Sequence, residues 1–207
     1  MPTIAQHIDE IRNLDVGNHT IRDIKKKNWD WLNFPEKDAL YGAIFVNDVI
    51  NLSRAEVKAE TDIKTKIMKV LMWGYKKTNG SLRPQYFDSI VNHLNVLEPI
   101  FADIQNRNLN AEERKNFFTR LRTVKGLGQS TYSKLLYFFN VSFEGKKCLI
   151  LDTFVIANLK VFDEFSGINW VQSKNCYLTY LNKIDELAGL HNVSPEQLER
   201  FLFGYRA

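Results

Sequence analysis

Apolar residues recur every three or four positions along almost the whole chain, and the strict alternation of a half-buried strand is nearly absent. This periodicity predicts helices at residues 4–12, 63–75, 86–101, 110–123, 129–139 and 152–162. A further helix is expected to open at Pro35, next to acidic residues that suit a first turn, and to continue through the apolar segment 39–52 as a central buried helix. The pattern therefore predicts an all-α fold.

Local signals indicate where some of these elements begin and end. Asn110 precedes an acidic first turn and is expected to cap the helix that follows. Ser194, followed by a proline and then by a glutamine at the third helical position, predicts the start of a last helix. An Asn-Gly pair and a proline within residues 76–84 indicate a loop. Because no repeat or long linker interrupts the pattern, residues 1–207 are expected to form a single compact domain.

Composition is that of an ordinary globular protein, with 44% hydrophobic and 25% charged residues. The formal net charge of +4 is compatible with a polyanionic partner but does not require one. No apolar run approaches the roughly 18 residues of a membrane span, and residues 1–15 lack the apolar centre of a signal peptide. We therefore expect a cytoplasmic protein that does not enter a membrane.

Side chains that could hold a metal are few. Cys148 and Cys176 cannot by themselves supply the four thiolates of an iron–sulfur cluster or of a four-cysteine zinc site. The four histidines are scattered without ligand spacing. We therefore expect no iron–sulfur cluster and no metal held by side chains.

Basic residues gather immediately before a glycine-rich turn. They are Arg114, Lys115, Arg120, Arg122 and Lys125. A solvated helix face would explain such a cluster by itself, but this one runs directly into residues 124–128 (VKGLG). Glycines permit a tight turn and allow a phosphate to approach the backbone, and the N–H groups at the start of the next helix can bind an anion.

A second element follows this turn: an apolar helix leads into residues 149–155 (LILDTFV), which contain Asp152. Turn, helix and aspartate together resemble the helix–hairpin–helix DNA glycosylase superfamily, although Val124 stands where the hairpin pattern of that superfamily has leucine. More narrowly, the chain is similar to the compact bacterial 8-oxoguanine-glycosylase-like family. Softer support comes from Trp73-Gly74-Tyr75, from residues 133–138 and from the closing segment 194–203.

This resemblance implies a fold and a partner. It implies two helical lobes, a helix–hairpin–helix motif at about 111–139 and a catalytic-aspartate segment at 149–159. It also implies that the protein binds double-stranded DNA as a monomer in the nucleoid of a bacterial cell. The residues expected to contact DNA are Lys125, Gly126, Gly128, Gln129, Ser130 and Thr131.

The chemistry of base excision gives Asp152 a role. Cleavage of an N-glycosidic bond develops positive charge on the sugar, which a carboxylate stabilises, and the same carboxylate can deprotonate a nucleophile. An aspartate before a helix is equally typical of an ordinary N-cap. The position of Asp152 downstream of the hairpin favours catalysis.

A lysine could act as the nucleophile. Lysine-using members of the superfamily place it second after the last hairpin glycine, where this chain has Ser130. Lys134 lies one turn later on the same helix face and 18 residues before Asp152 (152 − 134). We therefore expect Lys134 to act as the nucleophile, which would add strand-cleaving lyase activity. The alternatives are a solvent-facing or salt-bridged Lys134, with water activated by Asp152.

A flipped base needs a pocket, and the hairpin offers a place for a cation. Candidate pocket residues are Trp73, Ser130, Phe201 and Phe203, although each aromatic ring could equally belong to the core. Asn79 or Arg83 could fill the space left in the duplex. The resemblance also implies a monovalent cation or Mg²⁺ on the hairpin, with no other cofactor required. Its ligands would be the backbone carbonyls of Arg122, Val124 and Leu127.

The resemblance favours an oxidised purine such as 8-oxoguanine as the excised base. Two alternatives remain open at this stage: a non-catalytic helix–hairpin–helix DNA-binding protein, and a glycosylase that acts on modified foreign (phage) DNA. A helical protein–protein adaptor with an incidental basic patch is a weaker third alternative, and its binding to DNA should be negligible at physiological salt.

Overall fold

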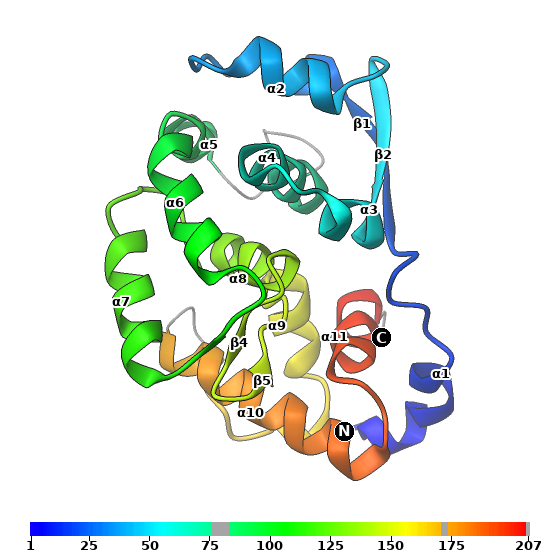
Figure 1. Ribbon diagram of the computed structural model, residues 1–207. Helices are drawn as coiled ribbons and strands as arrows, with labels where there is room; N and C mark the ends of the chain where they lie inside the picture. The colour runs from blue at the N-terminus through cyan, green and yellow to red at the C-terminus, as the bar shows by residue number, and fades with distance from the viewer. Residues whose placement is uncertain (76–82, 171–173, 206–207) are drawn as a thin grey trace.

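The protein is mostly helical in the computed structural model, which describes residues 1–75, 83–170 and 174–205 (Figure 1). The α-helices are α1 (Ile8–Arg12), α2 (Lys37–Ile44), α3 (Arg54–Ala59), α4 (Ile63–Gly74), α5 (Pro84–Val91), α6 (Leu94–Ile104), α7 (Ala111–Leu121), α8 (Gln129–Phe138), α9 (Thr153–Leu159), α10 (Lys174–His191) and α11 (Pro195–Gly204). The 3₁₀ segments are η1 (Ile4–His7), η2 (Lys26–Asn28) and η3 (Asp163–Phe165). Within the described residues, no helix is both long and apolar enough for a membrane span.

Two small sheets correct the expectation of an all-α fold. They are formed by β1 (Thr20–Lys25), β2 (Val49–Ser53), β3 (Asn108–Leu109), β4 (Ser142–Phe143) and β5 (Lys146–Lys147). β1 and β2 are antiparallel, with Thr20 opposite Ser53. In the second sheet β4 lies between β3, to which it is parallel, and β5, to which it is antiparallel.

The prediction of a helix from Pro35 through residue 52 is wrong for the second half of that segment. α2 ends at Ile44, and the chain turns through an Asn-Asp pair before it enters β2. Val46 is 84% exposed and Val49 is 45% exposed, so the apolar residues of this segment do not form one buried stripe. Asparagine and aspartate favour turns, and β-branched residues fit a strand, which together favour the observed break.

Other boundaries differ from the expected ones by less. The single helix predicted at 86–101 is divided into α5 and α6, and Asn92 at the break donates to the carbonyl of Asp88. α10 had no counterpart among the predicted helices. Of the two candidate wedge residues, Asn79 lies outside the described residues, and Arg83 is exposed just before α5.

The predicted caps are confirmed. The Asn110 side chain accepts from the N–H groups of Glu112 and Glu113, and Glu113 reaches back to the N–H of Asn110. Ser194 forms the corresponding reciprocal pair with Gln197 at the start of α11. These bonds satisfy N–H groups that a helix leaves free at its first turn.

Figure 1 shows α2 to α6 and the β1–β2 ribbon in the upper part of the molecule, and α7 to α11 with α1 in the lower part. α4 packs against α8 between them, where the rings of Trp73 and Phe138 meet edge to face at 5.1 Å. One continuous cluster of buried apolar side chains includes residues of both parts.

The first residues of the chain pack against its last helices (Figure 1). The ring of His7 contacts those of Phe162, Phe201 and Tyr205, at centroid distances of 5.8, 5.1 and 5.4 Å. The side-chain amide of Gln197 donates to the carbonyl of Arg12 at 2.8 Å. The N-terminal segment, residues 2–12, is therefore part of the packing of the lower half.

Candidate active site

The turn between α7 and α8 depends on one of its glycines more than on the other. Gly126 has a φ of +91°, and a Cβ on it would lie 2.7 Å from the Cβ and 2.9 Å from the carbonyl oxygen of Tyr86. Gly128 has a φ of −69°, and nothing lies within 4 Å of its added Cβ. Only Gly126 is therefore required by backbone conformation and by a close approach.

α8 begins with free backbone donors. Gly128 is the N-cap, and its carbonyl accepts from the N–H groups of Thr131 and Tyr132, both at 2.9 Å. In the described part of the chain, the N–H groups of Gln129 and Ser130 have no acceptor. The side chains of Gln129 and Thr131 are buried, so only their backbone could meet a ligand outside the helix.

Lys134 and Asp152 form a buried ion pair. Lys134 Nζ lies 3.1 Å from Asp152 Oδ2, and the two side chains are 3% and 7% exposed. Lys134 Nζ also donates to Ser130 Oγ at 2.9 Å and to the Ser130 carbonyl at 3.2 Å. These contacts use all three donors of an ammonium group. The three residues named from the sequence thus meet at one point.

Asp152 divides its two oxygens between two tasks. Oδ1 accepts from the N–H groups of Phe154 at 3.0 Å and Val155 at 3.1 Å, which caps α9. Oδ2 faces Lys134. Asp152 therefore caps α9, as one of the two sequence interpretations expected, and also contacts Lys134.

Two residues around Lys134 carried no separate signal in the sequence. The Tyr75 ring lies 5.2 Å from Lys134 Nζ, and its hydroxyl lies 2.9 Å from Thr131 Oγ1 and 3.4 Å from Ser130 Oγ. A Cβ on Gly74 would lie 2.6 Å from Lys134 Cδ, so only glycine leaves room for the lysine stem. In the sequence, the Trp-Gly-Tyr triplet supports only the resemblance, because residue spacing does not predict contacts between α4 and α8.

Comparison with known families matches residues 14–203 to the family described as "Putative 8-oxoguanine DNA glycosylase OGG-like protein". The chain belongs to this OGG-like family. No curated protein and no solved structure matched it. The matched range contains the glycine turn, Lys134, Asp152 and all of the candidate pocket residues.

Ser130 contacts Lys134, whereas the three aromatic candidates for the pocket of this OGG-like protein separate into two places. Trp73 and Phe203 have ring centroids 6.2 Å apart. Phe201 lies instead against His7 and Phe162 in the N-terminal packing described above. Phe154, which follows Asp152 closely, is 58% exposed and lies 6.0 Å from Phe203. Trp73, Phe203 and Phe154 thus form an aromatic row, and Phe201 is not part of it.

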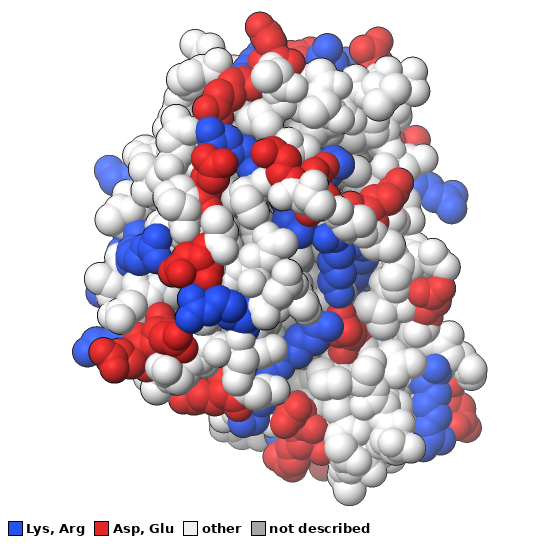
Figure 2. All heavy atoms as spheres, viewed as in Figure 1, with Lys and Arg blue, Asp and Glu red and all other residues white. Residues whose placement is uncertain are grey.

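The basic cluster is partly neutralised. Arg114 is paired with Glu144 at 3.0 Å, and Arg120 with Asp103 at 2.9 Å. Figure 2 shows lysines and arginines interspersed with acidic residues over this face. Among the described residues, no carboxylate lies within 4 Å of the remaining three basic side chains of the cluster. These three are Lys115, Arg122 and Lys125, and all are exposed.

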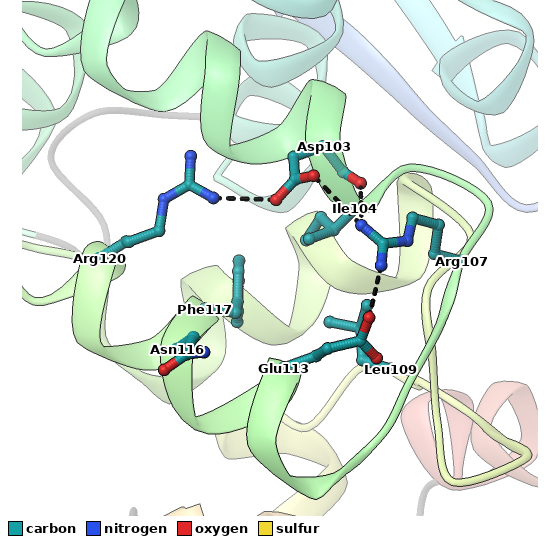
Figure 3. A pocket seen from close by; sticks show the side chains of 8 residues that line it. All are labelled: Asp103, Ile104, Arg107, Leu109, Glu113, Asn116, Phe117 and Arg120. Carbon is teal, nitrogen blue, oxygen red and sulfur yellow. Dashed lines mark hydrogen bonds and ion pairs between the residues drawn. The ribbon is translucent and has the colours of Figure 1, made fainter.

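A polar pocket of about 310 Å³ lies between α6 and α7 of the OGG-like protein (Figure 3). Asp103 is shared there by Arg107 and Arg120, which approach it from opposite sides, and Glu113 accepts from Arg107. Its charged groups therefore satisfy one another. The pocket does not include Lys134 or Asp152.

The expected cation ligands lie together. Arg122, Val124 and Leu127 line one pocket of about 230 Å³ beside the hairpin, with Tyr132. None of their carbonyl oxygens accepts a hydrogen bond from the described residues. Free carbonyls suit a hard cation, so these residues fit the expected group. The described residues contain no group of three or more His, Cys, Asp or Glu that could hold a metal through side chains.

Proposed function

We propose that this OGG-like protein is a DNA glycosylase that excises a modified base with Lys134 and Asp152 at its active centre. The supporting observation is the 3.1 Å contact between Lys134 Nζ and Asp152 Oδ2, in nearly complete burial and beside the hairpin. A buried amine next to a carboxylate is a recurrent arrangement for a reactive nucleophile.

In this proposal Lys134 attacks the C1′ carbon of the target nucleotide. The Nζ–C1′ bond forms as the glycosidic bond breaks, and the electron pair of that bond leaves with the base. Asp152 Oδ2 takes the proton that the ammonium must lose, and it can return a proton to the departing base. Loss of a second proton from nitrogen and opening of the sugar ring would give a Schiff base, which makes strand cleavage possible.

Asp152 is suited to this role because its other oxygen is fixed. The two backbone N–H groups that bind Oδ1 stabilise the carboxylate and hold it at the positive end of α9. Positive charge that develops on the sugar would therefore face a carboxylate whose orientation is already set.

Duplex DNA would be held at the hairpin. The free N–H groups of Gln129 and Ser130 suit a phosphate, and Lys125, which has no carboxylate within 4 Å among the described residues, supplies positive charge beside them. A cation on the hairpin carbonyls would add positive charge at the same place. The upper and lower groups of helices would form the two lobes of the enzyme.

Water activated by Asp152 is a second candidate chemistry. One observation favours it: Lys134 already uses all three donors within the protein, as a purely structural lysine would. In that case the enzyme would release the base without a covalent intermediate and without strand cleavage.

The decisive experiment is single-turnover excision from a duplex that carries 8-oxoguanine opposite cytosine, with and without borohydride. Wild type is compared with Lys134→Gln and Asp152→Asn. Lys66→Gln is the matched control, because Lys66 is 3% exposed but has no carboxylate within 4 Å among the described residues. We expect borohydride to trap wild type and the Lys66 variant, and Lys134→Gln to give no trapped complex.

Other outcomes separate the alternatives. Excision without trapping would assign the chemistry to water and Asp152. DNA binding without excision of 8-oxoguanine would contradict this substrate and favour another base or a binding-only protein.

A further inference from the structure

Polar atoms without partners gather next to the aromatic row. In the described part of the chain, no group forms a hydrogen bond with His19 Nδ1, Trp73 Nε1 or Arg54 Nε, although all three atoms are buried. The three side chains touch: the His19 and Trp73 rings are 5.1 Å apart, and the Arg54 guanidinium lies 5.3 Å from the Trp73 ring. Buried polar groups are nearly always satisfied, so such a cluster indicates a place where a polar group is still to be received.

His19 is held firmly in this place. Its carbonyl accepts from the N–H of Arg54 at 3.0 Å, and the next residue, Thr20, pairs with Ser53 in the β1–β2 ribbon. The small sheet therefore carries His19 to the end of α4, beside Trp73. A histidine placed by a backbone ladder can present a ring nitrogen in a fixed direction.

The imidazole of His19 is neutral. Burial lowers its pKa, and the nearby charges of Arg54 and Arg200 lower it further, to about 3. A neutral imidazole keeps one nitrogen as a hydrogen-bond acceptor, and the other is a donor. At physiological pH His19 can therefore accept a hydrogen bond inside an otherwise aromatic cluster.

The aromatic row connects His19 to the lysine–aspartate pair. His19 lies 5.1 Å from Phe203, Phe203 lies 6.0 Å from Phe154, and the N–H of Phe154 is bonded to Asp152. Trp73 precedes Gly74, which contacts the stem of Lys134. A group received at His19 would thus lie beside Phe203, whose ring contacts Phe154, two residues after Asp152.

The spacing of the two outer rings suits a planar guest. Trp73 and Phe203 are tilted by 35° with centroids 6.2 Å apart. A ring stacked between them needs about 7 Å, which is two contacts of about 3.5 Å. A small displacement of Phe203, which is only half-buried and whose ring lies 5.1 Å from that of His19, would open that space beside His19.

We propose that His19 Nδ1 reads the edge of the base that enters between Trp73 and Phe203, by accepting a hydrogen bond from a ring N–H. An oxidised purine carries such an N–H on its five-membered ring, where guanine has a bare nitrogen that would face the lone pair of Nδ1. His19 is therefore a specificity-determining residue that favours the oxidised base over guanine. This inference rests on the proposed glycosylase function and deepens it.

The test measures base recognition apart from bond cleavage. Titrations with 8-oxo-2′-deoxyguanosine and with 2′-deoxyguanosine are compared for wild type, His19→Phe and His19→Asn. We expect wild type to bind the oxidised nucleoside at least tenfold more tightly than the normal one. His19→Phe keeps a ring but loses the nitrogen, so the ratio should fall to about one to two. His19→Asn keeps a polar atom near Nδ1 and should retain part of the preference.

Stability and covalent trapping complete the experiment. Because Phe removes a buried unpartnered atom, the melting temperature of His19→Phe should equal or exceed that of wild type. An unchanged nucleoside ratio with a lower melting temperature would overturn the proposal, since Nδ1 would then serve the fold alone or hold a water. No saturable binding of either nucleoside to wild type would also overturn it.

Borohydride trapping on a duplex with an abasic site separates this inference from the proposed function. Trapping needs the Lys134 amine but no base, so His19→Phe should be trapped like wild type. If borohydride does not trap wild type on the abasic duplex, but the ratio of its affinities for the two nucleosides still depends on His19, the lysine chemistry is rejected and the role of His19 is retained. If wild type is trapped, but the ratio of its affinities for the two nucleosides does not depend on His19, only the role of His19 is rejected.

Discussion

At the scale of single residues, Asp152 combines two functions that are often assigned to different side chains. One oxygen caps α9 and the other pairs with Lys134. The two functions respond differently to substitution, because an asparagine side chain also caps helices well but carries no charge. The cap and the charge can therefore be separated by experiment.

We expect Asp152→Asn to lower the single-turnover excision rate by roughly 10²–10⁴-fold, the range for loss of a group that moves a proton. Asp152→Ala should lose excision to the same degree and should cost about 1 kcal/mol more in unfolding free energy, because it also removes the cap. Urea denaturation of both variants measures the difference. Equal unfolding free energies would mean that the two bonds to Oδ1 add nothing to stability.

Lys134 and Asp152 could be named from the sequence, but their surroundings could not. Helical spacing places Lys134 one turn after Ser130, and the resemblance places Asp152 downstream of the glycine turn. Tyr75, just after α4, contacts Lys134, and His19, just before β1, contacts Trp73 and Phe203. These contacts depend on how elements distant in the sequence pack. The four histidines are scattered along the sequence, so no spacing indicates the base-recognition role that we propose for His19.

At the scale of elements, the turn between α7 and α8 uses its two glycines differently. Gly126 is fixed by its positive φ and by the nearby backbone of Tyr86, whereas Gly128 has an ordinary φ and open space around it. Sequence alone treats the two positions alike, since both belong to the same short motif. Only the structure distinguishes a glycine needed for folding from one that can face a ligand.

We expect Gly126→Ala to lower the unfolding free energy by more than about 1 kcal/mol, because alanine is strained at this φ and its Cβ meets Tyr86. Gly128→Ala should change it by no more than about 0.5 kcal/mol. Thermal and urea unfolding of the two variants form a matched comparison. If phosphates approach Gly128, that variant should bind DNA more weakly in spite of its intact stability.

Ion pairs join α3, β5 and α11. Arg54 and Glu199 form a fully buried pair with contacts of 2.6 and 3.1 Å, and Glu196 accepts from Lys58 at 2.7 Å and from Lys147 at 2.9 Å. Burial would raise the pKa of Glu196, but the hydrogen bonds and charges of the two lysines outweigh it and lower the pKa to about 2.

This lowered pKa predicts how stability depends on pH. The unfolded chain has a glutamate pKa near 4.5, so the contribution of Glu196 is fully present above that pH and is lost as pH falls toward 2. Urea denaturation between pH 7 and pH 2 should therefore show wild type more stable than Glu196→Gln at pH 7, with the difference shrinking below pH 4.5. A difference that does not vary with pH would rule out this charge contribution.

The break between α2 and β2 shows where periodicity fails as a predictor of elements. The segment 39–52 has helical spacing of apolar residues, yet it contains a turn and a strand whose partner, β1, lies more than twenty residues earlier. Local propensity does not register such a pairing. Capped helices such as α7 and α11 were predictable because their signals are local.

At the scale of the whole molecule, basic and acidic side chains are interspersed on the surface (Figure 2), and the formal net charge is +4. Within the basic cluster, Arg114 and Arg120 are paired with carboxylates. Attraction of this cluster to a polyanion should therefore come from Lys115, Arg122 and Lys125, which have no carboxylate within 4 Å among the described residues.

We expect Lys125→Ala to reduce the slope of log binding constant against log salt concentration by about 0.9, the value for one lost phosphate contact. Arg114→Ala, a change of equal charge at a residue paired with Glu144, should leave the slope nearly unchanged. Fluorescence anisotropy of a labelled duplex at several salt concentrations gives both slopes. Equal slopes for the two variants would contradict the assignment of DNA binding to the hairpin.

The packing of residues 2–12 against the last helices has a consequence for the order in which the protein assembles on the ribosome. Synthesis at about 5–20 residues per second places roughly 10–40 s between the appearance of η1 and that of α11. During that interval Ile11, which is fully buried in the finished protein, lacks the contacts that α11 makes with α1. Residues 2–12 therefore reach their native place only after a helix that is synthesised much later has formed.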